Sequence, residues 1–239
     1  MGVAAAGSFA TDSMDEFSDI DLILAVEPEA SKAIMSDRRS IAASLGPLLS
    51  AFTGEHVGEP RLMICLYGPP LLHVDIKFVS LPDVTKRVED PVVLWERDGR
   101  LTSALQRGVP AYPEPDLQWI EDRIWVWVHY AAAKIARGEL FEAVEFLSFL
   151  RVTVLGPLAL VQAGARPAGV RRLETFAPAI ASELRETIAD ADARSCAAAL
   201  RRCIEIYRKL RGAAGTVRIT DAAERASVEY LLDVERRLP

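Results

Sequence analysis

The sequence predicts an α+β protein in which a small mixed β-sheet domain is followed by an all-α helical-bundle domain. Up to about residue 80, short apolar runs alternate with turn residues, a pattern typical of strands. From residue 116 onward, apolar residues recur at helical spacing. The stretch between them holds five prolines and shows little periodicity, which is typical of a connection between domains. We therefore expect a sheet domain at 1–90, a connection at 91–115 and a helical domain at 116–239.

Four strands and one helix are expected in the first domain. The apolar runs that predict strands are Val3–Ala6, Ile20–Val26, Arg61–Tyr67 and Leu72–Ser80. Between the second and third strands, residues 28–52 have a helical composition with apolar positions suited to one helix. Gly68-Pro69-Pro70 separates the last two strands, and this turn sequence predicts an antiparallel hairpin.

A bundle of four or five helices is expected in the second domain. The predicted helices cover residues 116–137, 140–161, 173–189, 193–211 and 221–237. The breaks between them are marked by Gly138, Gly164, Pro167, Gly169 and residues 212–215. The first helix is apolar nearly all round, which indicates a central position in the bundle. Four acids, Glu121, Asp122, Glu139 and Glu142, are interpreted as surface charges, and any that faced the site would suit a cationic acceptor.

The composition is that of an ordinary soluble globular protein. Half of the 239 residues are hydrophobic, and 28 basic against 34 acidic residues give a net charge of −6. An acidic chain without a Lys/Arg-rich cluster does not favour a stable nucleic-acid partner. The longest uncharged run, residues 152–165, is shorter than the roughly 20 residues of a membrane-spanning helix. Three scattered cysteines fit a reducing compartment. We expect a cytoplasmic protein without a membrane partner, and a homodimer stays open.

A pair of carboxylates, Asp19 and Asp21, is the first feature that points to chemistry. Side chains alternate across a strand, so both carboxylates project from the same face. Two adjacent negative charges repel each other. Mg²⁺ relieves this repulsion because it prefers oxygen ligands and commonly bridges carboxylates to substrate phosphates.

A third carboxylate, Asp75, lies on a strand that we expect beside the first pair. Three aspartates could hold two metal ions, the arrangement that serves in-line displacement at phosphorus. Lys77 follows on the same face and could add positive charge for a triphosphate, whereas His73, also on that face, is interpreted as a bystander. After the first strand, Gly7 permits close backbone approach, and the N–H groups that follow it and the Ser8 hydroxyl could bind phosphate.

Gly7-Ser8, the ten-residue spacing to Asp19-Ile20-Asp21 and the later Asp75 together resemble the motif of the DNA polymerase β-like nucleotidyltransferase superfamily. The match covers roughly residues 3–80. The resemblance implies that the first domain has the nucleotidyltransferase fold, that Ser8 contacts the triphosphate and that the three aspartates carry the metal ions. The helical half resembles, more loosely, the substrate domain of kanamycin-type aminoglycoside nucleotidyltransferases.

The looser resemblance implies further site residues on the first helix of the bundle. Kanamycin-type enzymes place a glutamate base four residues before a lysine that contacts phosphate. Here Lys134 can fill the lysine role, Tyr130 stands at the glutamate spacing and His129 lies beside it. The general base is therefore left open between His129 and Asp75.

The resemblance implies an enzyme that uses two Mg²⁺ ions and moves a nucleoside monophosphate from ATP or another nucleoside triphosphate. The acceptor would be a hydroxyl of a small molecule, with aminoglycoside-like compounds among the candidates, and AMP is the first choice of transferred group. Two alternatives stay open: a protein adenylyltransferase of the toxin–antitoxin type, and a catalytically silent nucleotide-binding protein.

Overall fold

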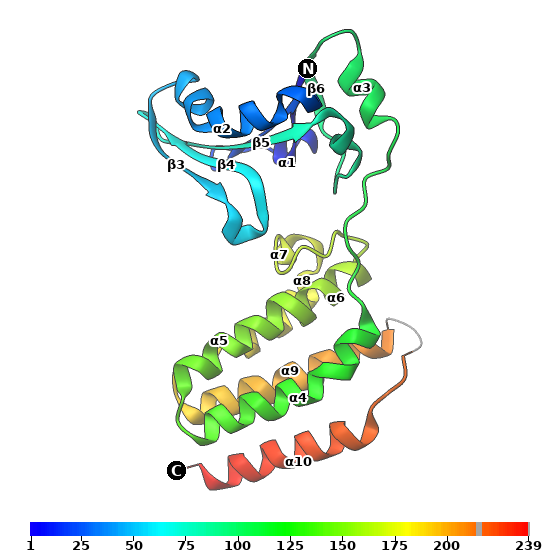
Figure 1. The fold of residues 1–239 in the computed structure, drawn as a ribbon. Coiled ribbons are helices and arrows are strands. Elements are labelled where there is room, and N and C mark those ends of the chain that lie inside the picture. The colour runs from blue at the N-terminus through cyan, green and yellow to red at the C-terminus, as the bar shows by residue number, and fades with distance from the viewer. Residues whose placement is uncertain (214–216, 239) are drawn as a thin grey trace. The chain divides into compact units, whose positions relative to one another are not determined.

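The computed structural model describes residues 1–213 and 217–238, which form two compact units divided between Tyr112 and Pro113. The first unit is a six-stranded sheet with helices, and the second is helical (Figure 1). This arrangement confirms the predicted α+β fold class. Gly215, predicted to help break the bundle, lies outside the described residues.

The sheet of the first unit is mixed. Its strands are β1 (Gly2–Ala5), β2 (Ile20–Val26), β3 (Leu48–Gly54), β4 (Glu59–Tyr67), β5 (Leu72–Ser80) and β6 (Val92–Glu96). They lie in the order β3-β4-β5-β2-β1-β6, and β2 and β5 pair in parallel while the other neighbours are antiparallel. The four predicted strands and the β4–β5 hairpin are confirmed.

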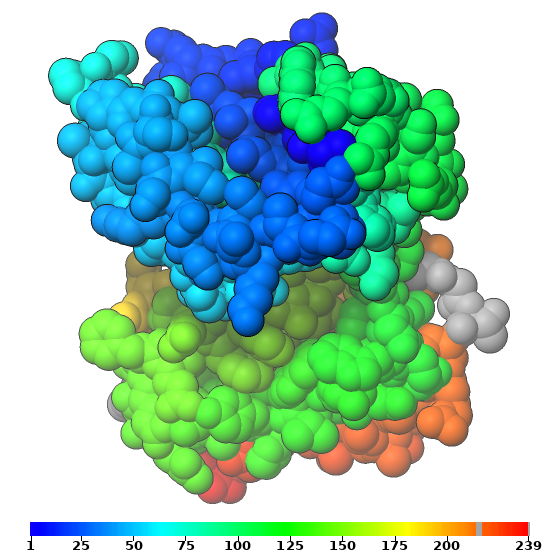
Figure 2. Space-filling view, turned by 45° about the horizontal axis from the view of Figure 1, so that its top comes forward, coloured from blue at the N-terminus to red at the C-terminus, as the bar shows by residue number. Residues whose placement is uncertain are grey.

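The two faces of the sheet have different surroundings. Helix α2 (Pro28–Ser44) packs on one face, over apolar side chains that include Val74, Ile76 and Phe78. In the space-filling view of Figure 2, the blue atoms, which include α2, form an exposed surface of the first unit. On the other face, the 3₁₀ helix η2 (Leu81–Thr85) and α3 (Arg100–Leu105) join a second apolar cluster around Val79. α1 (Gly7–Ala10) follows β1 directly.

Two segments of the first unit differ from the sequence prediction. The helix predicted over residues 28–52 ends at Ser44, and Leu48–Gly54 is strand β3. Gly46-Pro47 explains this end, since proline disfavours a helical conformation in the residue before it. Residues 91–115, predicted as a connection, contain β6, which pairs with β1, and α3. A five-residue strand is too short to show a clear alternation, and only its pairing partner reveals it.

The second unit follows the predicted helix order closely. Its helices are α4 (Leu117–Ala136), α5 (Leu140–Leu150), the π-helix η3 (Arg151–Leu155), α6 (Gly156–Gln162), α7 (Leu173–Phe176), α8 (Pro178–Leu184), the 3₁₀ helix η4 (Arg185–Thr187), α9 (Ala193–Ala213) and α10 (Asp221–Arg237). As its apolar surface predicts, α4 packs against α5, α9 and α10. Gly212, predicted as part of a break, lies within α9.

A single helical stretch, Leu140–Gln162, joins α5, η3 and α6. Gly156-Pro157 does not interrupt it, and the π-helical turn directly precedes this proline, which has no N–H to donate. By length and composition the stretch could cross a membrane, and half of its most apolar window is buried in the unit. Such burial is also typical of a core helix in a globular protein.

Glu121 is buried in the helical unit, with 0% of its side chain exposed, so its interpretation as a surface charge is wrong. Its carboxylate accepts hydrogen bonds from Tyr207 Oη at 2.6 Å and Trp125 Nε1 at 3.0 Å. Arg211 Nη1 lies 3.1 Å from the same carboxylate, and the N–H of Thr220 donates to it at 3.1 Å. Glu121 therefore joins α4, α9 and the start of α10 through a charge that is fully paired.

Candidate active site

The candidate site is built on the parallel pair β2 and β5. Their register places Asp21 beside Asp75 and Ile20 beside Val74, so Asp19, immediately before β2, lies level with His73. Because side chains alternate across strands, these four polar residues share one face of the sheet. The alternate positions on β5 are apolar and pack toward α2. The register therefore gathers the polar side chains on the face opposite α2.

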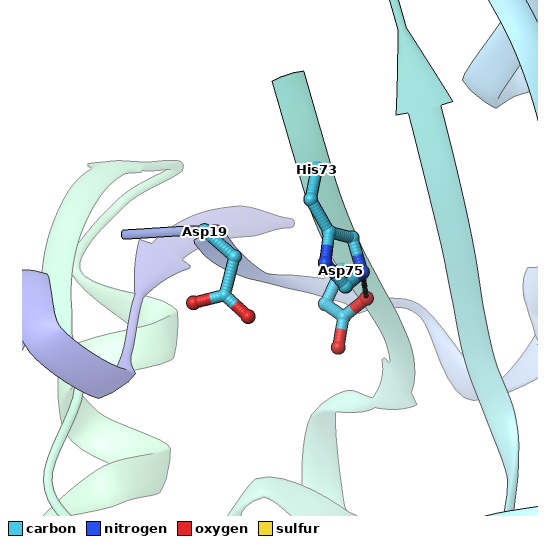
Figure 3. Close-up of side chains that lie close together, drawn as sticks. All are labelled: Asp19, His73 and Asp75. Carbon is cyan, nitrogen blue, oxygen red and sulfur yellow. Dashed lines mark hydrogen bonds and ion pairs between the residues drawn. The ribbon is translucent and has the colours of Figure 1, made fainter. Parts of the chain in front are cut away.

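Three of these side chains approach each other closely. His73 Nε2 lies 2.9 Å from Asp75 Oδ1, and a ligand atom from each of Asp19, His73 and Asp75 lies within 4.8 Å of the other two (Figure 3). The Asp75 side chain is 19% exposed and that of His73 48% exposed. His73, interpreted from sequence as a bystander, is thus part of the cluster. Its spacing of two residues from Asp75 was the signal that could have included it.

The electrostatics of the cluster favour a cation. Burial raises the pKa of the Asp75 carboxyl above its usual value; His73 acts to lower it and the neighbouring Asp19 to raise it further. Both the burial and the repulsion from Asp19 disfavour a second negative charge. A bound divalent cation would offset both effects, since it supplies opposite charge where the carboxylates meet.

Gly7 is held against the Asp21 carboxylate. Its backbone has φ of +58°, and a Cβ added there would lie 2.0 Å from Asp21 Oδ2. The N–H of Ala6 donates to the carbonyl of Asp21 at 2.9 Å, which ties this turn to β2. The N–H of Gly7, a residue predicted to bind the nucleotide, donates to Glu89 Oε1 at 2.9 Å. Ser8 follows within the short helix α1, and its contact with a triphosphate stays a prediction.

Replacing Gly7 with alanine is expected to damage this site beyond the cost of backbone strain. The positive φ alone costs an L residue about 1–2 kcal/mol, and the new methyl group must also displace the Asp21 carboxylate. Gly58→Ala is the matched control, because Gly58 has φ of +74° and open space around it. We expect similar losses of backbone stability in thermal melts but loss of divalent-metal binding, measured by calorimetry, only in Gly7→Ala. Equal metal binding by the two variants would contradict this account.

Lys77 lies farther along the same face of β5 but is paired. Its Nζ is 2.7 Å from Glu59 Oε2, and its side chain is 32% exposed. A hydrogen bond from Arg61 is the largest effect on Glu59; burial opposes it, and Lys77 adds to it, so the pKa of Glu59 falls to about 2. Lys77 also lines a pocket whose other cationic side chains are Arg61, Lys86 and Arg87. The rest of this pocket is lined by Asp83 and by apolar side chains, and Arg61 and Lys77 are both paired with Glu59. The predicted contact of Lys77 with a triphosphate stays a prediction.

The site residues predicted on the bundle belong to the second unit. Lys134 Nζ lies 2.7 Å from Glu139 and 3.0 Å from Glu142, and only 14% of its side chain is exposed. Tyr130 donates a hydrogen bond to Glu142, and the ring of His129 packs on Tyr230 with centroids 4.5 Å apart. The roles predicted for Lys134, Tyr130 and His129 stay predictions.

The carboxylates at Lys134 come from the start of the next helix. Gly138, with φ of +72°, allows the tight turn between α4 and α5 that brings Glu139 and Glu142 back to this lysine. From sequence, these two acids are interpreted as surface charges. The glycine four residues after Lys134 was the signal that could have paired them with it.

Two nucleotidyltransferase-related proteins are among the solved structures that the chain resembles. The chain is similar to an aminoglycoside 6-adenyltransferase from Bacillus subtilis, at 13% identity and a TM-score of 0.44, over 98% of this chain and 91% of that one. It is also similar to a nucleotidyltransferase-like protein from Exiguobacterium sibiricum, at 15% identity and a TM-score of 0.40, over 98% and 73%. No model of a protein family and no curated protein matches the chain. Identities and TM-scores this low do not support a function for this chain, so a function has to be argued from the residues on the sheet.

Proposed function

We propose that this chain is a metal-dependent nucleotidyltransferase. The observation that carries the proposal is the register of β2 and β5, which sets Asp21 beside Asp75, and Asp19 within the same cluster, on one face of the sheet. More particularly, the enzyme transfers a nucleoside monophosphate, AMP from ATP as the first choice, to a hydroxyl of a small molecule.

The donor set fits a divalent metal ion. Asp19, Asp21 and Asp75 would hold it through carboxylate oxygens, the ligands that Mg²⁺ prefers, and its charge would offset the burial that raises the pKa of Asp75. When bound, such an ion neutralises charge on the phosphates and favours attack at the α-phosphorus. The number of ions, two by the resemblance, is part of the proposal.

The protein residues then have three tasks. Lys77, two residues beyond Asp75 on β5, would supply positive charge that suits a triphosphate. The turn at Gly7 keeps the Asp21 carboxylate in place against the backbone. A general base removes the proton from the acceptor hydroxyl, and Asp75 and His129 are the candidates. Most of the rate enhancement would come from positioning and charge neutralisation.

The helical unit is proposed to supply the acceptor contacts. Around Lys134 it combines the carboxylates of Glu139 and Glu142 with the aromatic ring of Tyr130. Carboxylates bind amino groups and aromatic rings pack against apolar sugar faces, so this group suits a cationic, polyhydroxylated small molecule.

Pyrophosphate release tests the proposal. The full chain is incubated with ATP, GTP, CTP or UTP, with Mg²⁺ or Mn²⁺, and with a panel of aminoglycosides and other polyhydroxylated molecules. We expect release that requires one nucleotide, one acceptor and a divalent ion, and a product heavier by one nucleoside monophosphate in mass spectrometry. Silence across the panel while ATP and metal still bind would contradict a small-molecule acceptor. Modification of a co-purified protein, or none at all, would then separate a protein adenylyltransferase from a silent nucleotide binder.

A further inference from the structure

His73 lies among the candidate metal ligands. It precedes Asp75 by two residues on β5, and its Nε2 is 2.9 Å from Asp75 Oδ1 (Figure 3). Asp19 immediately precedes the neighbouring strand β2 and lies level with His73, and a donor atom from each of the three groups lies within 4.8 Å of the other two. About half of the His73 side chain is exposed, so an ion from solvent can reach the ring.

These contacts distinguish two possible roles of the imidazole: orienting a ligating carboxylate, or binding the metal ion itself. A histidine that merely orients a ligating carboxylate lies behind it, on the side away from the other ligands. His73 instead has a donor atom within 4.8 Å of ligand atoms from both Asp19 and Asp75. With bonds of about 2.1 Å, adjacent ligands of a divalent cation lie roughly 3 Å apart and opposite ligands roughly 4 Å apart. His73 and Asp75 already have the first of these separations, and small side-chain rotations can direct all three groups to one ion.

We propose that His73 supplies a nitrogen ligand to the metal ion held by Asp19 and Asp75, and that this mixed donor set selects Mn²⁺ over Mg²⁺. The inference rests on the metal site of the proposed function and adds to it the identity of the ion. The carboxylates alone predict Mg²⁺ instead.

The selectivity follows from ligand chemistry. Mg²⁺ is a hard cation that favours oxygen ligands and gives up its bound waters reluctantly. First-row transition ions accept imidazole more readily, and neutral histidine is the commonest protein ligand of such ions. Three carboxylates alone would discriminate little between Mg²⁺ and Mn²⁺, so one nitrogen in place of a water would favour Mn²⁺.

Pulsed electron paramagnetic resonance of bound Mn²⁺ tests the ligand directly. The chain has three histidines, His56, His73 and His129, so single glutamine variants can assign any nitrogen signal. Mn²⁺ is added to the full chain without nucleotide, because a purine would contribute nitrogen of its own. We expect the modulation of a directly bound ¹⁴N in the wild type, in His56→Gln and in His129→Gln, and its loss in His73→Gln.

Metal affinity provides the second readout. Calorimetry with Mn²⁺ and competition with Mg²⁺ are expected to show that His73→Gln weakens the binding of Mn²⁺ at least about tenfold. The binding of Mg²⁺ is weakened less, so the ratio of the Mn²⁺ affinity to the Mg²⁺ affinity falls. A thermal melt like that of the wild type shows that the variant is folded.

The outcomes separate this inference from the proposed function. Suppose that the wild type binds Mn²⁺, that Asp75→Asn abolishes this binding, and that the wild-type spectrum shows no directly bound nitrogen. His73 is then not a ligand, and the proposed metal site of the transferase is still supported. If the ratio of Mn²⁺ affinity to Mg²⁺ affinity is the same in His73→Gln as in the wild type, the proposed selectivity for Mn²⁺ is wrong, and the metal site is again still supported. If the wild type binds neither ion, the inference and the proposed metal site both fail.

Discussion

Asp21→Asn is expected to abolish nucleotidyl transfer while leaving the fold intact. Asparagine keeps the shape of the side chain and removes the charge that, with Asp75 on the adjacent strand, would hold the metal ion. A bound metal stabilises the transition state by several kcal/mol, so a decrease of about 10³-fold or more in turnover is expected. Asp75→Asn should have a comparable effect. The measurement is pyrophosphate release with the acceptor found in the panel, together with a thermal melt.

Asp37→Asn is the matched control for this experiment. Asp37 is exposed on α2, which packs on the opposite face of the sheet from the carboxylate cluster. The same change of charge and shape there should leave turnover within about twofold, since surface substitutions have small effects. If Asp21→Asn retained turnover, the proposed mechanism would be wrong, regardless of the result for Asp37→Asn.

Glu121→Gln is expected to cause a large loss of stability in the helical unit. The carboxylate is fully buried and accepts hydrogen bonds from Tyr207, Trp125 and Thr220 while Arg211 neutralises its charge. An amide turns an NH₂ group toward these donors and leaves the Arg211 charge with less compensation. Breaking a buried ion pair costs on the order of 3 kcal/mol. We expect a clearly lower Tm by circular dichroism.

The exposed Glu145 on α5 offers the control for Glu121. Glu145→Gln makes the same chemical change on the surface, where the expected effect is within about 0.5 kcal/mol. A Tm for Glu121→Gln equal to that of the Glu145 variant would show that the buried network contributes nothing to stability.

The pH dependence of stability gives the Glu121 prediction a second test. Burial on its own would raise the pKa of Glu121, but hydrogen bonds from Tyr207, Trp125, Thr220 and Arg211 outweigh it and lower the pKa from 4.5 to about 2. A depressed carboxyl pKa stabilises the fold above pH 4.5, and this contribution is lost as the pH falls toward 2. The wild-type Tm should therefore fall more steeply over this range than that of Glu121→Gln, as measured by calorimetry.

Much of the candidate site follows from local spacing. Asp19 and Asp21 two residues apart, and Asp75 between apolar neighbours, share a face as soon as their segments are strands. Gly7 was singled out for close backbone approach, and the structure shows what approaches it, the carboxylate of Asp21. His73 has the same spacing to Asp75 as Asp19 has to Asp21. Spacing alone did not distinguish it from a solvated surface histidine.

The parts of the fold that were missed depend on which strand each segment pairs with. Leu48–Gly54 has apolar residues that suit a helix or a strand equally well, and its pairing with β4 decides the matter. Val92–Glu96 becomes β6 because β1 offers it an open edge. Short segments have weak intrinsic preferences, so tertiary pairing overrides them.

The sequence by itself determined the order of sheet and bundle, the hairpin at Gly68-Pro69-Pro70 and the faces on which the aspartates lie. These properties depend on periodicity and turn chemistry, which are local. Only the tertiary structure decided that β2 and β5 are neighbours in register, that His73 joins Asp19 and Asp75, and that Glu121 is buried rather than exposed. Each of these depends on groups that are brought together from segments far apart in the chain, and no local pattern contains that information.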